Sequence, residues 1–337
     1  MQTSAQTEVQ VTGEFITLNG ERFYAINNVD KMAPFFISVV SDSDHWLFVS
    51  SNTGLSAGRV SPETALFTYE TVDRIHDSHP HTGCKTLIKK ILDGKSQLWE
   101  PFNKEHNDRY NVTRNIYKTV LGHKLCFEET NNDLQLTYRY TWETSAEYGF
   151  VRSCQLVNLA KNDAQVELID GFQNILPAGT PRYTQANCSN LVDAYKWTEL
   201  EPTSGVGIFS LFSGITDKAE PCESLKANTV FTLGLDDKKV LLSSNQLNAF
   251  KQGQQVSQED VIKGIRAAYL VNFSDSISAG EQKSWQFVTN IEQSQPQIVS
   301  LIQSLSDPES LLQSITTSIE EGTDGLAKKM AAADGFQ

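Results

Sequence analysis

The sequence predicts a mainly β protein: a large two-sheet antiparallel sandwich or barrel, followed by C-terminal helices. From residue 8 to about residue 288, short β-branched or aromatic runs are broken by Asn, Asp, Gly and Pro at the intervals typical of antiparallel sheets. The stretch 257–263 is the one expected internal helix, so helices do not alternate with strands and a parallel βαβ fold is disfavoured. The 337 residues, 39% of them hydrophobic, are sufficient for a large core.

The first element is a predicted β-hairpin. Residues 9–12 and 14–18 flank Gly13, and Asn19-Gly20 is the dipeptide of a type I′ turn that leads into residues 22–26. Further strands are expected at 45–50, 65–69, 84–92, 97–101 and 110–117.

The middle of the chain predicts a meander of strands at 119–129, 133–144 and 150–159. Because side chains alternate along a strand, one face of the second strand is apolar and the other polar. The apolar face carries Leu134, Leu136, Tyr138 and Tyr140, and the polar face carries Gln135, Thr137, Arg139 and Thr141. The remaining strands are expected at 165–172, 191–200, 206–212, 229–233, 267–273 and 284–291.

Helical periodicity replaces the strand pattern after residue 291. Residues 294–297 and 306–309 both read as capping boxes, with Pro296 and Pro308 in the first turn. Two apolar stripes follow at three-and-four spacing: Ile298, Leu301, Ile302 and Leu305, then Leu311, Leu312, Ile315 and Ile319. A third helical segment is expected at 323–333. We therefore predict a β domain over 1–291 and a helical linker over 292–337 that begins a further, truncated helical domain.

The composition argues against some classes of binding partner. The net charge of −13 and the absence of long basic runs argue against nucleic acid or an anionic membrane as a partner, and favour a neutral or cationic small molecule. The N-terminus has no signal-peptide pattern and no segment is apolar enough to span a membrane, so a cytoplasmic protein is expected. The five cysteines are expected to be reduced, and no motif predicts a metal or another cofactor.

The segment 50–83 is the predicted site, because it combines turn residues with many hydrogen-bonding side chains. One hypothesis is that the segment binds a sugar, with charged side chains that hydrogen-bond to hydroxyl groups and an aromatic face for a pyranose ring. Its candidate residues are Trp46, Arg59, Glu70, Asp73, Arg74, His76 and His81. A second hypothesis is a metal site, with His79 and His81 as ligands together with Asp73 or Asp77. In a third reading the segment is a surface loop whose polar contacts fix its own backbone or dock another domain.

Two aromatic and acidic clusters lie outside that segment, at 99–102 and 139–143. Such clusters line carbohydrate grooves, but alternating aromatics on a strand are more often core. Glu100 and Glu143 are accordingly expected to form surface salt bridges, because acid–base chemistry on a sugar needs two carboxylates across one groove.

Three stretches resemble the N-terminal domain of large bacterial proteins related to cellobiose and chitobiose phosphorylases, glycoside hydrolase family 94. They are RFYAINNVDKMAPFF (22–36), WLFVSSNTGLSAGR (46–59) and the closing AADGFQ (332–337). The resemblance implies a β-super-sandwich of the galactose-mutarotase-like type, then linker helices and an (α/α)-barrel that carries the catalytic acid. It also implies that this chain lacks the catalytic acid, so its catalytic residues are unknown.

Three functional hypotheses follow. The leading one is a carbohydrate-associated N-terminal module of a cytoplasmic glycoside phosphorylase or hydrolase-like protein, which shapes a sugar site and makes contacts with the missing catalytic domain or in a homodimer. The second is a mutarotase-type sugar epimerase that pairs His76 or His81 with Glu70 or Asp170. The third is a structural dimerisation scaffold.

Overall fold

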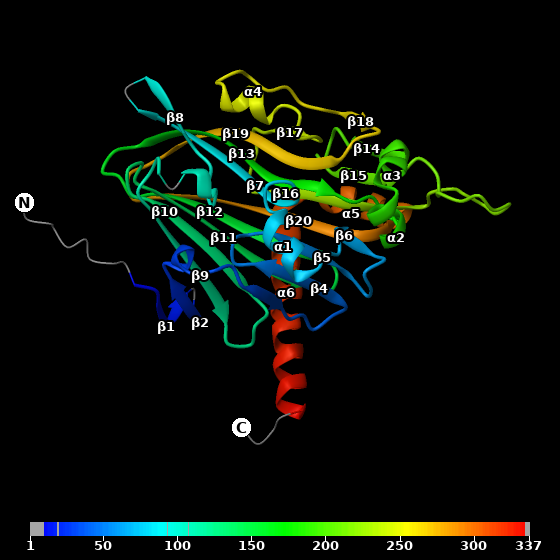
Figure 1. Ribbon diagram of the computed structural model, residues 1–337, viewed down its shortest axis with the longest axis horizontal. Helices are drawn as coiled ribbons and strands as arrows, with labels where there is room; N and C mark the ends of the chain where they lie inside the picture. The colour runs from blue at the N-terminus through cyan, green and yellow to red at the C-terminus, as the bar shows by residue number, and fades with distance from the viewer. Residues whose placement is uncertain (1–9, 19, 93, 107, 334–337) are drawn as a thin grey trace, which may run out of the picture.

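The structure, a computed structural model, describes residues 10–18, 20–92, 94–106 and 108–333, which form three sheets and several helices (Figure 1). Every strand pairing among these residues is antiparallel. The large sheet has 11 strands, in the spatial order β1 (Thr12–Leu18), β2 (Glu21–Asn27), β9 (Val112–Thr119), β10 (Leu125–Asn131), β11 (Leu136–Ser145), β12 (Gly149–Asn158), β20 (Gln282–Ser294), β16 (Lys226–Leu233), β15 (Gly207–Leu211), β14 (Lys196–Leu200) and β18 (Val261–Lys263).

Two smaller sheets complete the β structure. The five-stranded sheet has the order β17 (Lys239–Leu241), β19 (Ala267–Ile277), β13 (Ala164–Ile175), β7 (Gly83–Leu92) and β8 (Lys95–Trp99). The four-stranded sheet has the order β3 (Phe36–Val39), β4 (His45–Ser50), β5 (Leu55–Arg59) and β6 (Ala65–Phe67). The helices are η1 (Val29–Lys31), α1 (Val72–Ser78), η2 (Lys104–His106), α2 (Arg182–Asn187), α3 (Ser189–Tyr195), α4 (Leu247–Lys251), α5 (Gln295–Ser304) and α6 (Pro308–Ala333).

One continuous core joins the large sheet to both smaller sheets. Trp142 of β11 stacks on Phe172 of β13 with ring centroids 5.4 Å apart, and Phe172 in turn meets Phe67 of β6 at 5.8 Å. The large sheet therefore forms one layer and the two smaller sheets the other. The predicted fold class, a mainly β two-layer antiparallel structure followed by C-terminal helices, is confirmed.

Side-chain alternation explains how the large sheet packs. Leu134, Leu136, Tyr138 and Tyr140 are all buried, as the sequence pattern predicts. The hairpin is also confirmed by continuous pairing from Thr12 with Asn27 to Leu18 with Glu21. Gly20 has a positive φ of 81°, which suits the expected turn, whereas residue 9 and Asn19 lie outside the described residues.

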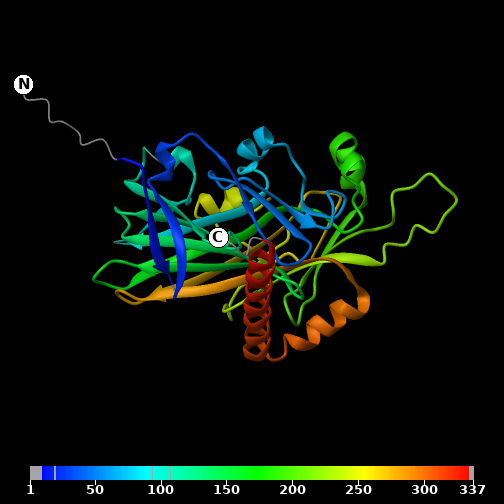
Figure 2. The ribbon, with the colours of Figure 1, turned by 90° about the horizontal axis from the view of Figure 1, so that it is seen from below.

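The two C-terminal helices pack on the face of the large sheet that is turned away from the smaller sheets (Figure 2). The first capping box is confirmed, because Ser294 and Gln297 cap α5 reciprocally. The second is wrong by one residue: the Asp307 carboxylate accepts the Ser310 N–H (3.1 Å), while the Ser306 hydroxyl donates to the Gln303 carbonyl at the end of α5.

The expected third helical segment is not separate, because α6 continues without a break to Ala333. Inside this helix the Thr323 hydroxyl donates to the Ile319 carbonyl (3.0 Å), so the threonine needs no capping position. None of the described helices is both long and apolar enough to cross a membrane.

Two further secondary-structure predictions are wrong. Residues 257–263 form no helix; their last three residues are β18, which pairs with β14 and turns Ile262 toward the core. Residues 191–195 belong to α3, and the strand β14 begins only at Lys196. Segments as short as these fit both periodicities, and 257–263 has only Val261 and Ile262 as apolar residues, so tertiary contacts decide between helix and strand.

Candidate functional site

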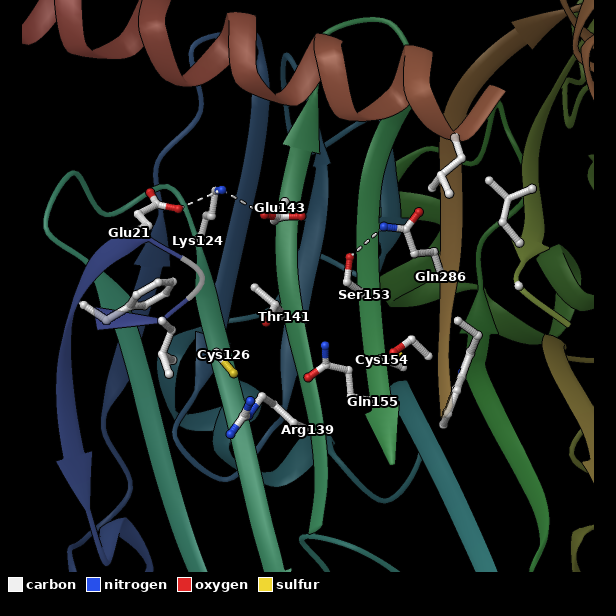
Figure 3. Close-up of a pocket in the computed structure, with 17 residues that line it drawn as sticks. Glu21, Lys124, Cys126, Arg139, Thr141, Glu143, Ser153, Cys154, Gln155 and Gln286 are labelled. Carbon is white, nitrogen blue, oxygen red and sulfur yellow. Dashed lines mark hydrogen bonds and ion pairs between the residues drawn. The ribbon is translucent and has the colours of Figure 1, made fainter. Parts of the chain in front are cut away.

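A groove of about 430 Å³ lies on the outer face of the large sheet, beside α6 (Figure 3). We call it the sheet groove. The β1–β2 hairpin borders it on one side, the end of β16 on another, and α6 contributes Leu312. Its lining residues are Leu18, Glu21, Phe23, Lys124, Cys126, Arg139, Thr141, Glu143, Ser153, Cys154, Gln155, Leu233, Gly234, Ser284, Trp285, Gln286 and Leu312.

Strand register builds the floor of the sheet groove. Thr141 of β11 lies opposite Ser153 of β12, and Ser153 lies opposite Gln286 of β20. A second row lies two residues further along each strand: Arg139 is opposite Gln155, and Gln155 is opposite Ser284. Because every second residue of a strand faces the same side, these two rows place hydroxyl, amide and guanidinium groups on one surface.

The charged end of the sheet groove is an ion-pair network around Lys124, and His123 Nε2 lies 3.1 Å from one carboxylate oxygen of Glu21. The Lys124 ammonium lies 2.8 Å from the other Glu21 carboxylate oxygen and 3.1 Å from one of Glu143. Burial raises the pKa of the Glu143 carboxyl, and Lys124 offsets part of this effect. Burial also acts to lower the pKa of Lys124, but Glu143 and Glu21 outweigh it and raise that pKa. All three charges are therefore satisfied within the network.

The second cation of the sheet groove is also paired. Arg139 donates from Nε to the Glu128 carboxylate at 2.8 Å and makes a further contact to it through its terminal nitrogen. Tyr117 and Asn115 donate to the same carboxylate. This shared carboxylate holds the guanidinium in place.

The neutral side chains of the sheet groove are less satisfied. The Gln286 amide donates to Ser153 Oγ at 3.0 Å, but its buried Oε1 accepts no hydrogen bond from the described residues. The side chains of Gln155 and Ser284 also make no hydrogen bond to any described residue. Gln155 is half-buried and Ser284 is exposed, so their polar groups are open to a ligand or to water, and a buried acceptor such as Gln286 Oε1 rarely stays without a partner.

The seven predicted site residues do not line the sheet groove; four lie around α1 or in it. Glu70 and Arg74 form an ion pair (3.6 Å), and the Asp73 carboxylate accepts from Thr71. His76 shares a hydrogen bond with Ser50 at 2.7 Å, between Nδ1 and Oγ. These contacts fix the loop to itself and to β4.

The other three predicted residues lie elsewhere. Trp46 of β4 stacks on Phe48 at 5.7 Å, on the outer face of the four-stranded sheet. His81 is exposed and lines a second groove. A sugar contact for any of the seven stays a prediction.

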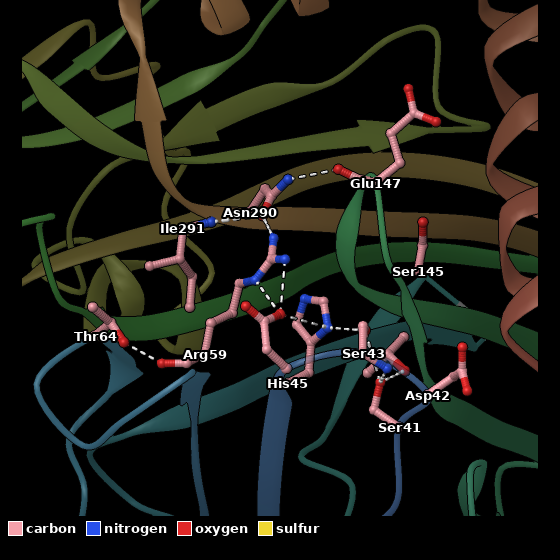
Figure 4. A network of polar contacts seen from close by, with 12 residues as sticks. Ser41, Asp42, Ser43, His45, Arg59, Thr64, Ser145, Glu147, Asn290 and Ile291 are labelled. Atoms are coloured by element: carbon pink, nitrogen blue, oxygen red, sulfur yellow. Dashed lines mark hydrogen bonds and ion pairs between the residues drawn. The ribbon is translucent and has the colours of Figure 1, made fainter. Parts of the chain in front are cut away.

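Arg59 of β5 belongs to a partly exposed polar network that includes Asp44, just before β4, and Asn290 of β20 (Figure 4). Its guanidinium contacts Asp44 Oδ1 at 2.8 and 2.9 Å and donates to Asn290 at 3.1 Å. Nearby His45 is buried, and burial together with the Arg59 charge lowers the pKa of His45 to about 4. The imidazole is therefore neutral at pH 7, and both of its polar contacts, to Ser43 and Asp44, fall on the same nitrogen. That geometry is not a proton relay, which uses both ring nitrogens.

Asp170, the carboxylate of the mutarotase hypothesis, lies in the core and not in a groove. Its side chain is fully buried, 2.6 Å from Arg152, and it also accepts from Thr86, Tyr138 and Trp285. A carboxylate with all these partners and no solvent access cannot exchange protons with a sugar. The structure therefore overturns its expected role.

Both glutamates expected in surface salt bridges do form ion pairs, although neither pair is on the open surface. Glu143 pairs with Lys124 in the sheet groove, and its side chain is 16% exposed. Glu100 is buried and binds Lys85 and Lys251. Burial acts to raise the pKa of Glu100, but the two lysines outweigh it and lower the pKa to about 2.

The depressed pKa of Glu100 predicts a pH-dependent contribution to stability. The folded protein favours the ionised carboxylate of Glu100. The stability that this carboxylate contributes should therefore be fully present above the ordinary pKa of 4.5, and it should be lost as the pH falls through about 2. We expect Glu100→Gln to lower the free energy of unfolding by about 2–3 kcal/mol at pH 7. Urea unfolding of both proteins from pH 7 to pH 2 would measure this.

The control is Glu281→Gln, an exposed glutamate. Its stability should match that of the wild type throughout. A Glu100→Gln deficit that stays constant down to pH 2 would contradict the assigned ionisation.

No three or more His, Cys, Asp or Glu residues of the described chain are grouped so that they could hold a metal ion. His79, a residue of the metal reading, lies in a small cavity with Lys85 and Glu100. Burial and the charge of Lys85 lower the pKa of His79 to about 4.

Sequence reasoning found only part of the sheet groove. It singled out Arg139, Thr141 and Glu143, but it missed Glu21, Lys124, Ser153, Gln155, Ser284 and Gln286. The available signal was polar residues at alternate positions in the strands 150–159 and 284–291. Only the register of β11, β12 and β20 shows that these residues meet.

Comparisons with known proteins add likenesses of fold only. No family model matches the chain, and no curated protein does. Among solved structures, a bacterial glucoamylase complexed with acarbose has a TM-score of 0.49 at 9% identity, over 87% of this chain and 36% of its own. A polysaccharide lyase has a TM-score of 0.42 at 8% identity, over 81% of this chain and 34% of its own. A galactose mutarotase-like protein from Clostridium acetobutylicum has a TM-score of 0.38 at 10% identity, over 84% of this chain and 98% of its own.

The chain thus spans about a third of the glucoamylase and of the lyase. At such identities and TM-scores, these likenesses transfer neither an activity nor a ligand to this chain. They do not single out glycoside hydrolase family 94, which stays a prediction from the sequence.

Proposed function

We propose that this chain is a carbohydrate-associated module that binds a neutral oligosaccharide in the sheet groove without converting it. The observation that carries the proposal is the pair of cross-strand rows, in which Gln155, Ser284 and Gln286 Oε1 have no partner among the described residues while the charged groups are already paired. Apolar side chains, among them Phe23 and Leu233, lie beside these rows. A few placed polar groups on a partly apolar lining are typical of small-molecule sites.

Binding fits this geometry better than hydrolysis. Glu21 and Glu143 both contact Lys124, so the ammonium occupies the space between the two carboxylates. Hydrolysis of a glycoside requires the scissile bond, or water, to lie between the acid and its partner. We propose that the parent protein, a cytoplasmic glycoside phosphorylase or hydrolase-like protein, carries its catalytic acid in another domain.

We expect Gln155→Ala to weaken oligosaccharide binding by roughly 3- to 10-fold, the loss of about one neutral hydrogen bond. Isothermal titration calorimetry with cello-, chito- and malto-oligosaccharides would measure it. The matched control is Gln254→Ala, an exposed glutamine outside the sheet groove, which should bind as the wild type does.

The same preparations separate the proposal from the epimerase hypothesis. Polarimetry of fresh α-glucose should show the uncatalysed rate of mutarotation. A rate that rises with protein concentration and falls in His76→Ala would favour the epimerase. Equal oligosaccharide affinity of Gln155→Ala and the wild type would refute the sheet groove as the site.

A further inference from the structure

A second groove, of about 510 Å³, lies at the end of the five-stranded sheet. We call it the end groove. The end of β13, the residues before β7, α3, α4 and the loop before β19 all contribute to it. Its lining residues are Pro80, His81, Lys85, Gln173, Asn174, Asp193, Ser244, Asn245, Leu247, Asn248, Lys251, Gly264, Ile265 and Arg266.

The end groove is positively charged in a protein whose net charge is −13. Lys85 and Lys251 share the single carboxylate of Glu100, which leaves one positive charge in excess. Arg266 adds a second, and its side chain forms no ion pair or hydrogen bond within the described residues. Asp193 contributes nothing to the balance, because Lys196 neutralises it at 2.7 Å. Local positive charge attracts anions even on an acidic protein.

Asn174 gives the end groove a buried acceptor that has no partner among the described residues. It adopts a φ of 57°, a conformation that non-glycine residues rarely take, at a bulge of β13 between Gln173 and Ile175. Its amide donates to Thr82 Oγ1 at 2.9 Å, whereas its buried Oδ1 accepts no hydrogen bond from the described chain. Asparagine takes this conformation more readily than most residues, so the unpaired acceptor is the informative feature, because buried polar atoms rarely stay without partners.

The opposite side of the end groove supplies adaptable hydrogen-bonding groups. Ser244, Asn245 and Asn248 are exposed at the start of α4, and their side chains make no hydrogen bond within the described residues. Hydroxyl and amide groups of this kind suit a ligand that both donates and accepts hydrogen bonds.

We infer that the end groove binds a small anionic polyol, a sugar or similar alcohol that carries a phosphate or a carboxylate. Arg266 would hold the oxyanion, because a guanidinium matches the planar or forked oxygens of both groups. The excess charge of the Lys85–Lys251–Glu100 cluster adds to the attraction for an anion in the end groove. Asn174 Oδ1 would accept a hydrogen bond from a ligand hydroxyl. This site is independent of the sheet groove.

Isothermal titration calorimetry with glucose 6-phosphate, glucuronate, inorganic phosphate and glucose tests the inference. We expect saturable binding of at least one of the two anionic sugars, tighter than that of glucose or of phosphate alone. Comparing glucose 6-phosphate with glucuronate distinguishes a phosphate from a carboxylate. Arg266→Ala should weaken the binding by roughly 10- to 100-fold, the effect of losing a charged hydrogen-bond partner.

Two further variants complete the test. Lys95→Ala removes an exposed cation of β8 outside the end groove and should leave the affinity unchanged. Asn174→Gly suits the positive φ, so the fold should be retained while the affinity falls. Absence of binding by both anionic sugars, or equal affinity in Arg266→Ala, would overturn the inference. Neutral oligosaccharide binding in the sheet groove should persist in Arg266→Ala, so the two proposals fail separately.

Discussion

Replacing Arg152 with leucine is expected to lower the free energy of unfolding by about 3–5 kcal/mol. The side chains of Arg152 and Asp170 are fully buried and 2.6 Å apart. Arg152 also donates to the Gly171 carbonyl, and its guanidinium lies 4.8 Å from the ring centre of Tyr140. Its removal leaves the Asp170 charge in the core without a cation, which is the costly way to break a buried pair. Urea unfolding followed by tryptophan fluorescence would measure the loss.

A double substitution shows whether the unpaired charge causes that loss. Adding Asp170→Asn to Arg152→Leu removes the orphan carboxylate, so part of the lost stability should return. Arg74→Leu, at a side chain that is 72% exposed, is the control and should change stability by less than about 0.5 kcal/mol. If the double variant is as unstable as the sum of its single variants, lost packing around Arg152 is the cause instead.

The fold could be predicted from the sequence because its signals are local. The alternation of Leu134, Leu136, Tyr138 and Tyr140 defines a half-buried strand without reference to any other segment. The same holds for the capping box of Ser294 and Gln297. Strand order carries no such local signal: β20 pairs with β12 and β16, which are distant in the sequence.

Both candidate sites depend on that distant pairing. Ser153 meets Gln286 only because β12 and β20 are neighbours in this register, and a shift by one residue would turn both side chains to the other face. In the end groove, Arg266 and His81 come from separate segments. Sequence reasoning instead favoured 50–83, where polar residues are dense along the chain. Many of these residues, such as His76 with Ser50, satisfy one another locally.

Replacing Ile315 with alanine is expected to lower the free energy of unfolding by about 2–5 kcal/mol. Ile315 is fully buried where α6 meets the large sheet, in one cluster with Val151, Phe231 and Val288. Truncation removes apolar contact and leaves a cavity between two rigid layers that cannot close it completely. Val299→Ala in α5, at a residue that is 53% exposed, is the control and should have a small effect.

The same variant tests whether α6 is part of the β structure or a linker that only rests on it. If α6 folds cooperatively with the sheet, Ile315→Ala should lower the unfolding midpoint in urea while the transition stays single. Oligosaccharide affinity should then change little in the protein that remains folded, although Leu312 of α6 borders the sheet groove. If α6 is a separate linker, Ile315→Ala should instead split the transition, with loss of helical circular dichroism preceding the fluorescence change. That second result would place the structural boundary at the β20–α5 junction, next to the 291/292 boundary predicted from the sequence.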